Sequence, residues 1–217
     1  MTSILFAVLA VLTVKNLAYW KDGERLFTHA LEVTGSNWMA HDSLGDALLK
    51  KGKVRAASGH FQEALRLYPG YAHGEYNLGV TLALQGRLAD AEAHFREAIR
   101  LQPNYADAEF NLGNALARQG EDAEAIAYLR QAARDDPGSA ATHAGMGTAL
   151  LNVGRFEEAV TSLSEAVRVK PDFAVAHYNL ARALELQGKS SAASDHYARA
   201  FQLDPALRAQ AERRQKP

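Results

Sequence analysis

Residues 72–105 read AHGEYNLGVTLALQGRLADAEAHFREAIRLQPNY, and the next 34 residues, 106–139, read ADAEFNLGNALARQGEDAEAIAYLRQAARDDPGS. The two stretches share Asn-Leu-Gly near the start, a glycine in the middle and a proline near the end. A repeat of this length indicates a stack of two-helix hairpins, in which neighbouring hairpins bury their apolar faces against each other. The same spacing continues in both directions, with prolines at Pro69, Pro103, Pro137, Pro171 and Pro205.

Five units of equal length fill residues 38–207 without an insertion: 38–71, 72–105, 106–139, 140–173 and 174–207. We number the positions of each unit from 1 to 34. Leucine, once methionine, occupies positions 7 and 11, which share one helix face. Glycine or alanine at positions 8 and 20 lets two helices approach closely. Glycine at position 15 and proline at position 32 end the two helices. We expect first helices at 38–51, 72–85, 106–119, 140–153 and 174–187, and second helices at 54–67, 88–101, 122–135, 156–169 and 190–203.

This pattern resembles the tetratricopeptide repeat family, and the resemblance covers 170 of the 217 residues (five units of 34). It implies an all-α fold, a right-handed α-solenoid of helix-turn-helix hairpins whose first helices line a concave face. Position 4 departs from the family, which often has tryptophan there. This sequence instead has His41, Glu75, Glu109, His143 and His177.

Two segments flank the five units. Residues 3–14 carry no charge, and Lys15, Tyr19 and Trp20 follow them. We expect an apolar, membrane-associated helix over 1–20; the alternatives are an apolar helix packed on the first hairpin, which would leave the chain soluble, and a cleaved signal peptide. Residues 21–37 fit the second helix of a degenerate repeat with Asp22 as its N-cap. Residues 208–217 fit a cap helix and tail. The side of the membrane stays open.

The composition argues against several functional classes. The chain has no cysteine, which excludes disulfides and thiolate metal sites, and its net charge of −1 gives no reason to expect nucleic acid. Phosphate-loop, G-x-S-x-G and H-E-x-x-H motifs are absent from the sequence. Histidines recur at positions 4 and 23, but equal positions lie a whole repeat apart, so we interpret them as surface or packing residues. We expect no enzyme, no cofactor and no metal site.

The family resemblance implies that positions 2, 5, 6, 9, 12 and 13 of the first helices face the concave groove. An amide side chain can pair with a peptide unit as donor and acceptor, so Asn77, Asn111 and Asn179 at position 6 would hold an extended peptide. They resemble the asparagine ladder in the repeat domain of the O-linked N-acetylglucosamine transferase. Alternatively, these asparagines tie one hairpin to the next. The other expected contact residues are Tyr76, Phe110 and Tyr178, which form an apolar stripe or pack between helices, together with Asn114 and Arg182.

Two functions are consistent with these features. The first is a non-catalytic scaffold that binds a protein or peptide segment in the concave groove. The second comes from residues 17–34 and 37–45, which resemble the join between the last membrane helix and the repeats in the transmembrane-and-tetratricopeptide-repeat proteins. That family resembles protein O-mannosyltransferases. The chain would then be the C-terminal repeat portion of a membrane glycosyltransferase, presenting acceptor protein to a catalytic domain outside this chain.

Overall fold

The computed structural model describes residues 22–215, without the side chains of Gln210 and residues 212–215. The described residues form helices joined by short turns and contain no strand, which confirms the all-α fold class. The apolar helix expected over residues 1–20 lies outside them. Within residues 22–215, no helix combines the length and the apolar character that crossing a membrane requires.

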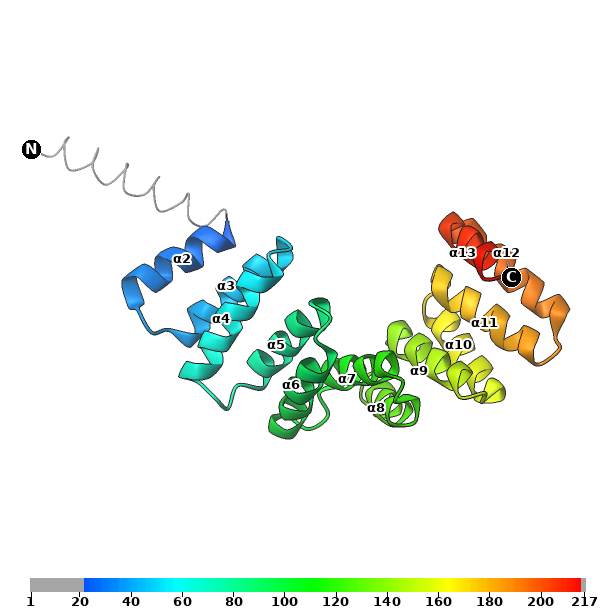
Figure 1. Cartoon of the computed structure of the whole chain (residues 1–217), viewed down its shortest axis with the longest axis horizontal. Coiled ribbons are helices and arrows are strands. Elements are labelled where there is room, and N and C mark those ends of the chain that lie inside the picture. Colours follow the sequence, from blue (N-terminus) through cyan, green and yellow to red (C-terminus); the bar gives the residue numbers. More distant parts are fainter. Residues whose placement is uncertain (1–21, 216–217) are drawn as a thin grey trace, which may run out of the picture. The chain divides into compact units, whose positions relative to one another are not determined.

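Ten helices form the five expected hairpins, and each begins at the predicted residue and ends within one residue of the predicted end (Figure 1). The first helices are α3 (Trp38–Lys50), α5 (Ala72–Leu84), α7 (Ala106–Gln119), α9 (Ala140–Asn152) and α11 (Ala174–Leu186). The second helices are α4 (Val54–Leu67), α6 (Leu88–Leu101), α8 (Asp122–Asp135), α10 (Phe156–Val169) and α12 (Ser190–Leu203). The flanking helices are α2 (Gly23–Thr34) and α13 (Pro205–Gln215).

The turn inside each hairpin has one recurring geometry. The glycine at position 15 adopts a left-handed φ of 72° to 86° in all five units, a conformation that strains any residue with a Cβ. The next backbone N–H then donates to a carbonyl five residues earlier, as Lys53 does to Leu48 at 2.9 Å. This bond satisfies a carbonyl that the end of the helix would otherwise leave unpaired.

The two helices of a hairpin approach most closely at position 8. A Cβ built on Gly79 would lie 2.6 Å from the ring of Phe95, and one built on Gly113 would lie 2.6 Å from Cγ of Leu129. These side chains at position 24, like their counterparts in the first and fourth hairpins, are fully buried. The fifth hairpin has Ala181 at position 8, and its position 24 residue is a partly exposed tyrosine. The close approach explains the glycine in the other four hairpins.

The contacts divide the chain into two units, one that ends at Leu101 and one that begins at Gln102. In the first unit, α2 to α6 pack in chain order. In the second unit, α7 to α13 pack in chain order, and α9 also contacts both α7 and α11 directly. Because the helices of residues 22–215 pack on near neighbours along the chain, the buried alanines and leucines run along each unit instead of meeting at one centre.

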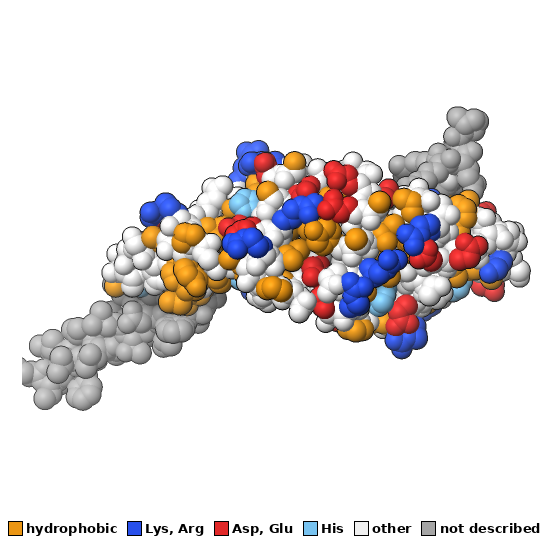
Figure 2. Space-filling model, turned by 90° about the horizontal axis from the view of Figure 1, so that it is seen from below, with side chains coloured by type: hydrophobic (Ala, Val, Ile, Leu, Met, Phe, Trp, Pro, Cys, Tyr) orange, Lys and Arg blue, Asp and Glu red, His pale blue; other side chains and the backbone are white. Residues whose placement is uncertain are grey.

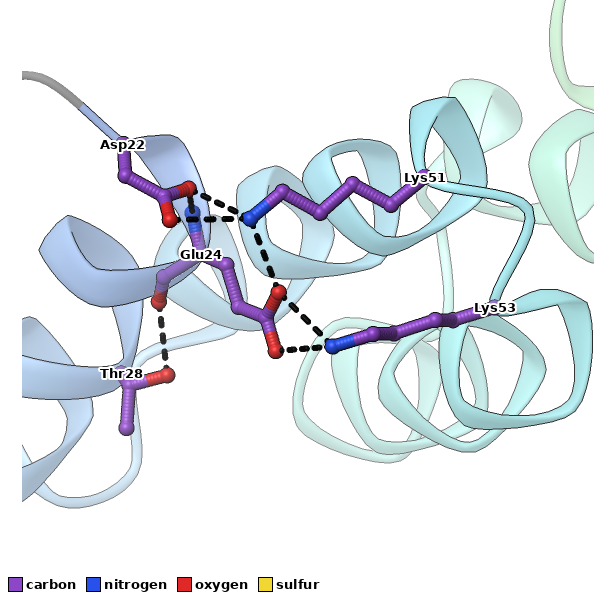
Figure 3. Close-up of polar contacts among 5 residues, drawn as sticks. All are labelled: Asp22, Glu24, Thr28, Lys51 and Lys53. Atoms are coloured by element: carbon purple, nitrogen blue, oxygen red, sulfur yellow. Dashed lines mark hydrogen bonds and ion pairs between the residues drawn. The ribbon is translucent and has the colours of Figure 1, made fainter.

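An ion-pair cluster attaches α2 to the first hairpin (Figure 3). The side chain of Asp22 caps α2 by accepting a hydrogen bond from the backbone N–H of Glu24 at 3.1 Å. Lys51 Nζ lies 2.7 Å from Asp22 and 3.0 Å from Glu24, and Lys53 Nζ lies 2.7 Å from Glu24. Both lysines flank the glycine of the turn between α3 and α4. Since α2 has no buried residue, its attachment depends on these exposed pairs and on half-buried apolar contacts.

Candidate functional site

Positions 2, 6, 9 and 13 of a first helix point in nearly the same direction, because these spacings return to one side of the helix. We call these residues of the five first helices the first-helix face. Within residues 22–215, seven large apolar side chains are exposed, and four of them lie on this face. They are Met39 (57% exposed), Leu84 (63%), Val175 (45%) and Leu186 (53%). On this face, the exposed apolar groups stand at positions 2 and 13 of a helix, and positions 6 and 9 between them are polar apart from Gly145 and Val80.

A contact between position 9 of one hairpin and position 6 of the next recurs within the units, and we call it a joint. The amide nitrogen of Asn77 donates to Asp46 at 3.3 Å, and that of Asn179 donates to Thr148 at 3.0 Å. Where Gly145 takes position 6, a Cβ would lie 3.1 Å from Oδ1 of Asn114. The side chain of Asn114 therefore lies where the position 6 side chain would otherwise stand.

The joint between the first two hairpins is a cluster of titratable groups. The amide nitrogen of Asn77 faces Asp42 at 3.4 Å and Nδ1 of His73 at 3.1 Å, and the Tyr71 hydroxyl donates to Asp42 at 2.9 Å. The Asp42 carboxylate, 3.8 Å from His73, raises the pKa of that imidazole. Burial, followed by the charge of Asp42, raises the pKa of Asp46. This cluster fastens α3 to α5 with groups whose charges respond to pH.

The structure places the predicted asparagines in different settings. Asn77 and Asn179 are buried and bonded to the preceding hairpin, as the alternative interpretation expects; their role in peptide binding stays a prediction. Asn111 is half-buried and donates to the carbonyl of Asp107 in its own helix at 2.9 Å. Asn114 is half-buried, and its amide has no hydrogen-bond partner among residues 22–215. Asn114 is thus the amide best placed to bond a group from outside the chain.

The other predicted contact residues divide in the same way. Tyr178 is buried, and its ring centroid lies 5.6 Å from that of Tyr197 and 6.3 Å from that of Phe201. Tyr76 and Phe110 are half-buried. Arg182 is also half-buried, and it donates to the side-chain oxygen of Asn179 at 3.4 Å. Packing accounts for Tyr178, whereas the other three keep surface that a partner could contact.

In three hairpins, the side chain at position 4 of the first helix faces the side chain at position 23 of the second helix. A comparison of equal positions in different repeats does not reveal such a contact, because it lies within one repeat. Residues 19 apart meet because the two helices are antiparallel. The pairs are His41–His60 at 3.0 Å, Glu75–His94 at 2.6 Å and His177–His196 at 3.0 Å. Among residues 22–215, no three or more histidine or carboxylate side chains gather in the geometry of a metal site.

The third hairpin buries a carboxyl at position 4. Glu109 is only 3% exposed. Its pKa is raised to about 7 by burial first, and then by a hydrogen bond and repulsion from Asp135. Asp135 stands at position 30, which is leucine or valine in the other four units. This substitution in an otherwise apolar column was the sequence signal that could have revealed the pair.

Charges of both signs alternate over the second helices. Arginine and glutamate pairs three residues apart recur as Arg66–Glu63 and Arg100–Glu97, both at 2.6 Å, with a further pair in α10. On the face shown in Figure 2, acidic and basic side chains lie next to one another. Such a surface is well solvated and does not concentrate one charge for a nucleic-acid backbone.

Comparison with known proteins identifies a family whose model matches the sequence and solved structures that share the fold. A match to the family described as "Tetratricopeptide repeat" covers residues 43–106, 85–140 and 145–208. No curated protein matches the sequence.

Solved structures share the fold at low sequence identity. YrrB, described as "a TPR protein with an unusual peptide-binding site", is 22% identical with a TM-score of 0.69, covering 85% of this chain and 97% of that one. MamA from Desulfovibrio magneticus RS-1 is 20% identical with a TM-score of 0.72, covering 80% and 98%. Another MamA structure is 22% identical with a TM-score of 0.70, covering 79% and 94%.

Proposed function

Because the chain belongs to the tetratricopeptide repeat family, we propose that it is a non-catalytic scaffold that binds an extended segment of a partner protein on its first-helix face. The observation that supports this most directly is the position of the exposed apolar side chains. Single exposed apolar residues are ordinary on a protein surface. Here the exposed apolar residues recur at positions 2 and 13 of the first helices in both units, on either side of positions 6 and 9, which are mostly polar.

The residues that contact the partner are a subset of those expected from the sequence. Asn114 offers an unpartnered amide, and one peptide unit of an extended segment can satisfy both its donor and its acceptor. Phe110, on the same helix α7, keeps exposed surface beside it. Asn111 and Arg182 are half-buried and complete the proposed contact set of the second unit, and Tyr76, also half-buried, is the corresponding contact residue of the first unit taken by itself. Asn77, Asn179 and Tyr178 support the face from within the joints and the core.

Peptides selected from a random library against the full chain provide the test. Asn114→Ala removes one bidentate amide contact, so it should weaken the selected peptides about 5- to 30-fold, as expected for roughly 1–2 kcal/mol. Gln62→Ala, which removes an exposed amide from the second helix α4, is the matched control and should leave binding unchanged. Circular dichroism checks that both variants keep the helical content of the parent protein.

Hydrogen exchange with and without a selected peptide locates the binding surface. Slowed exchange concentrated in α7, α9 and α11 supports the proposal. Protection confined to the second helices, together with unchanged affinity of Asn114→Ala, would place the binding surface elsewhere and overturn it.

The O-mannosyltransferase-like alternative gains no support from the family match or from the structural relatives, and we do not adopt it. Membrane association through residues 3–20 is an independent prediction. Flotation of the full chain with liposomes, compared with a chain that starts at Asp22, tests it: flotation of both or of neither would contradict it.

A further inference from the structure

Arg182 is the position 9 residue of α11 and lies half-buried on the first-helix face of the second unit. Three arginines near the ends of second helices each pair with a glutamate three residues earlier, as Arg100 does with Glu97 at 2.6 Å. The residue three before Arg182 is Asn179, whose neutral side-chain oxygen accepts from Nη1 of Arg182 at 3.4 Å. No carboxylate among the described side chains forms an ion pair with Arg182. Its positive charge therefore lacks the compensation that those three arginines have.

The groups beside Arg182 are already engaged. The amide nitrogen of Asn179 donates to Oγ1 of Thr148 on α9 at 3.0 Å, which turns the amide oxygen toward Arg182. Glu185, three residues further along α11, accepts from the Tyr197 hydroxyl on α12 at 2.8 Å. A guanidinium has five N–H groups. Those that do not meet Asn179 have no partner in the described part of the chain, so they are available to a group from outside it.

We propose that Arg182 binds an aspartate or glutamate side chain of the partner segment and so makes the first-helix face of the second unit selective for an acidic segment. This inference rests on the binding function proposed above. A carboxylate can accept two parallel hydrogen bonds from the planar fork of an arginine, and such charge-assisted bonds are stronger than neutral ones. An amide in its place offers a single oxygen and no charge.

The surroundings of Arg182 favour a side-chain carboxylate. On the same face of α11, Val175 and Leu186 are 45% and 53% exposed, whereas Arg182 is half-buried. A segment whose backbone rests on the two exposed apolar groups therefore reaches the guanidinium with a side chain. Covering those groups also removes water from around the ion pair, which strengthens the attraction between the two charges.

The position of Arg182 sets a spacing within the bound segment. Asn114 and Arg182 occupy the same position of α7 and α11, and α9 contacts both helices directly. Packed helices are about 8–10 Å apart, so the two residues are separated by roughly 16–20 Å. An extended segment advances about 3.3 Å per residue, so its acidic residue should lie about five or six residues from the peptide unit that Asn114 binds.

The test is a selection against the full chain from a synthetic library of random peptides with amidated C-termini, in which only side chains supply carboxylates. We expect aspartate or glutamate to be enriched at one position. Replacing that residue by its amide should weaken binding about 10- to 100-fold. Arg182→Ala should cause the same loss, and in this variant the amide replacement should have no further effect. Arg182→Glu should instead select lysine or arginine at that position.

Two further measurements separate this pairing from a general effect of charge. Arg199→Ala removes an exposed arginine from the second helix α12 of the same hairpin, where it donates to the neutral side chain of Gln202 at 2.8 Å. This matched control should leave the affinity unchanged. Peptides shortened from the acidic end should lose their sensitivity to Arg182→Ala and keep their sensitivity to Asn114→Ala. Circular dichroism verifies the fold of each variant.

The inference and the proposed function fail in different ways. Selected peptides that depend on Asn114 but show no enriched acidic residue, or that bind Arg182→Ala as tightly as the parent chain, would overturn the role of Arg182 and leave the scaffold function standing. An equal loss of affinity in Arg199→Ala and Arg182→Ala would do the same, because it would indicate attraction by net charge alone. Peptides insensitive to both Asn114→Ala and Arg182→Ala, with protection confined to the second helices, would overturn both proposals.

Discussion

A buried carboxyl inside the third hairpin makes the stability of the chain depend on pH. Glu109 has a pKa of about 7 in the folded chain and an ordinary value of 4.5 when exposed. Between these values the folded state binds more protons than the unfolded state, so stability falls as pH rises from 4.5 to 7. Below 4.5 the group is neutral in both states and costs nothing electrostatically.

Replacing this carboxyl tests the effect directly. Glu109→Gln keeps the shape but cannot ionise, so it should stabilise the chain by about 1–3 kcal/mol at pH 8 and have little effect at pH 4. Urea denaturation followed by circular dichroism at both pH values measures the difference. Glu75→Gln is the control at the same position: it replaces the carboxylate that faces His94 by a neutral amide, which is a weaker acceptor, and should destabilise. Equal effects of Glu109→Gln on stability at pH 4 and pH 8 would contradict a raised pKa of Glu109 in the folded chain.

The glycines at position 8 lead to a prediction about packing. Gly113→Ala places a methyl group 2.6 Å from Leu129, and this overpacking should cost about 1–3 kcal/mol of the free energy of unfolding. Ala181 already carries that methyl group in the fifth hairpin. There the position 24 side chain, Tyr197, is partly exposed and donates its hydroxyl to Glu185 at 2.8 Å. Ala181→Gly should therefore bring no gain. Urea midpoints that rise for Gly113→Ala would refute this account.

Among the elements, α2 has the weakest attachment. It has no buried residue, and the lysines of the α3–α4 turn hold its first turn (Figure 3). Exposed ion pairs are screened by salt. We expect Lys51→Ala with Lys53→Ala, or added salt, to speed amide hydrogen exchange in α2 while α5 and α6 stay protected. Lys50→Ala, next to the cluster but outside it, is the control. Unchanged exchange in α2 of the double variant would show that apolar contacts suffice.

The helices could be predicted from the sequence because their signals are local. Position 15 glycine and position 32 proline act on the backbone of their own turns, so the boundaries of the ten repeat helices agree to within one residue. Contacts across helices could not be predicted in the same way. The repeat shows that equal positions are equivalent, but it does not show that position 4 meets position 23 or that position 6 meets position 9. The contact between Glu109 and Asp135 also became visible only from the way in which the antiparallel helices α7 and α8 pack.

At the scale of the whole molecule, the helices of residues 22–215 pack on near neighbours along the chain within each unit. In such arrays the effect of a mutation spreads through interfaces between adjacent repeats. Phe61→Ala empties a fully buried position in the first hairpin and should cost about 3–5 kcal/mol locally. Hydrogen exchange should accelerate in α3, α4 and α5 and stay unchanged in α11 and α12. A uniform acceleration over all hairpins would indicate one cooperative core instead.

The differences between the joints have a consequence for rearranged chains. The 34-residue period of the backbone would allow any block of 34 residues to be removed or moved in frame. The side chains at the joints prevent such an exchange, because each position 9 residue fits the position 6 residue that follows it. Asp46 accepts from the amide of Asn77, Asn114 packs against the backbone of Gly145, and Thr148 accepts from Asn179. Moving the fourth block behind the first would leave a carboxylate opposite a glycine. Shuffled versions of this gene should therefore encode less stable proteins than the native order, although every block keeps its own helices.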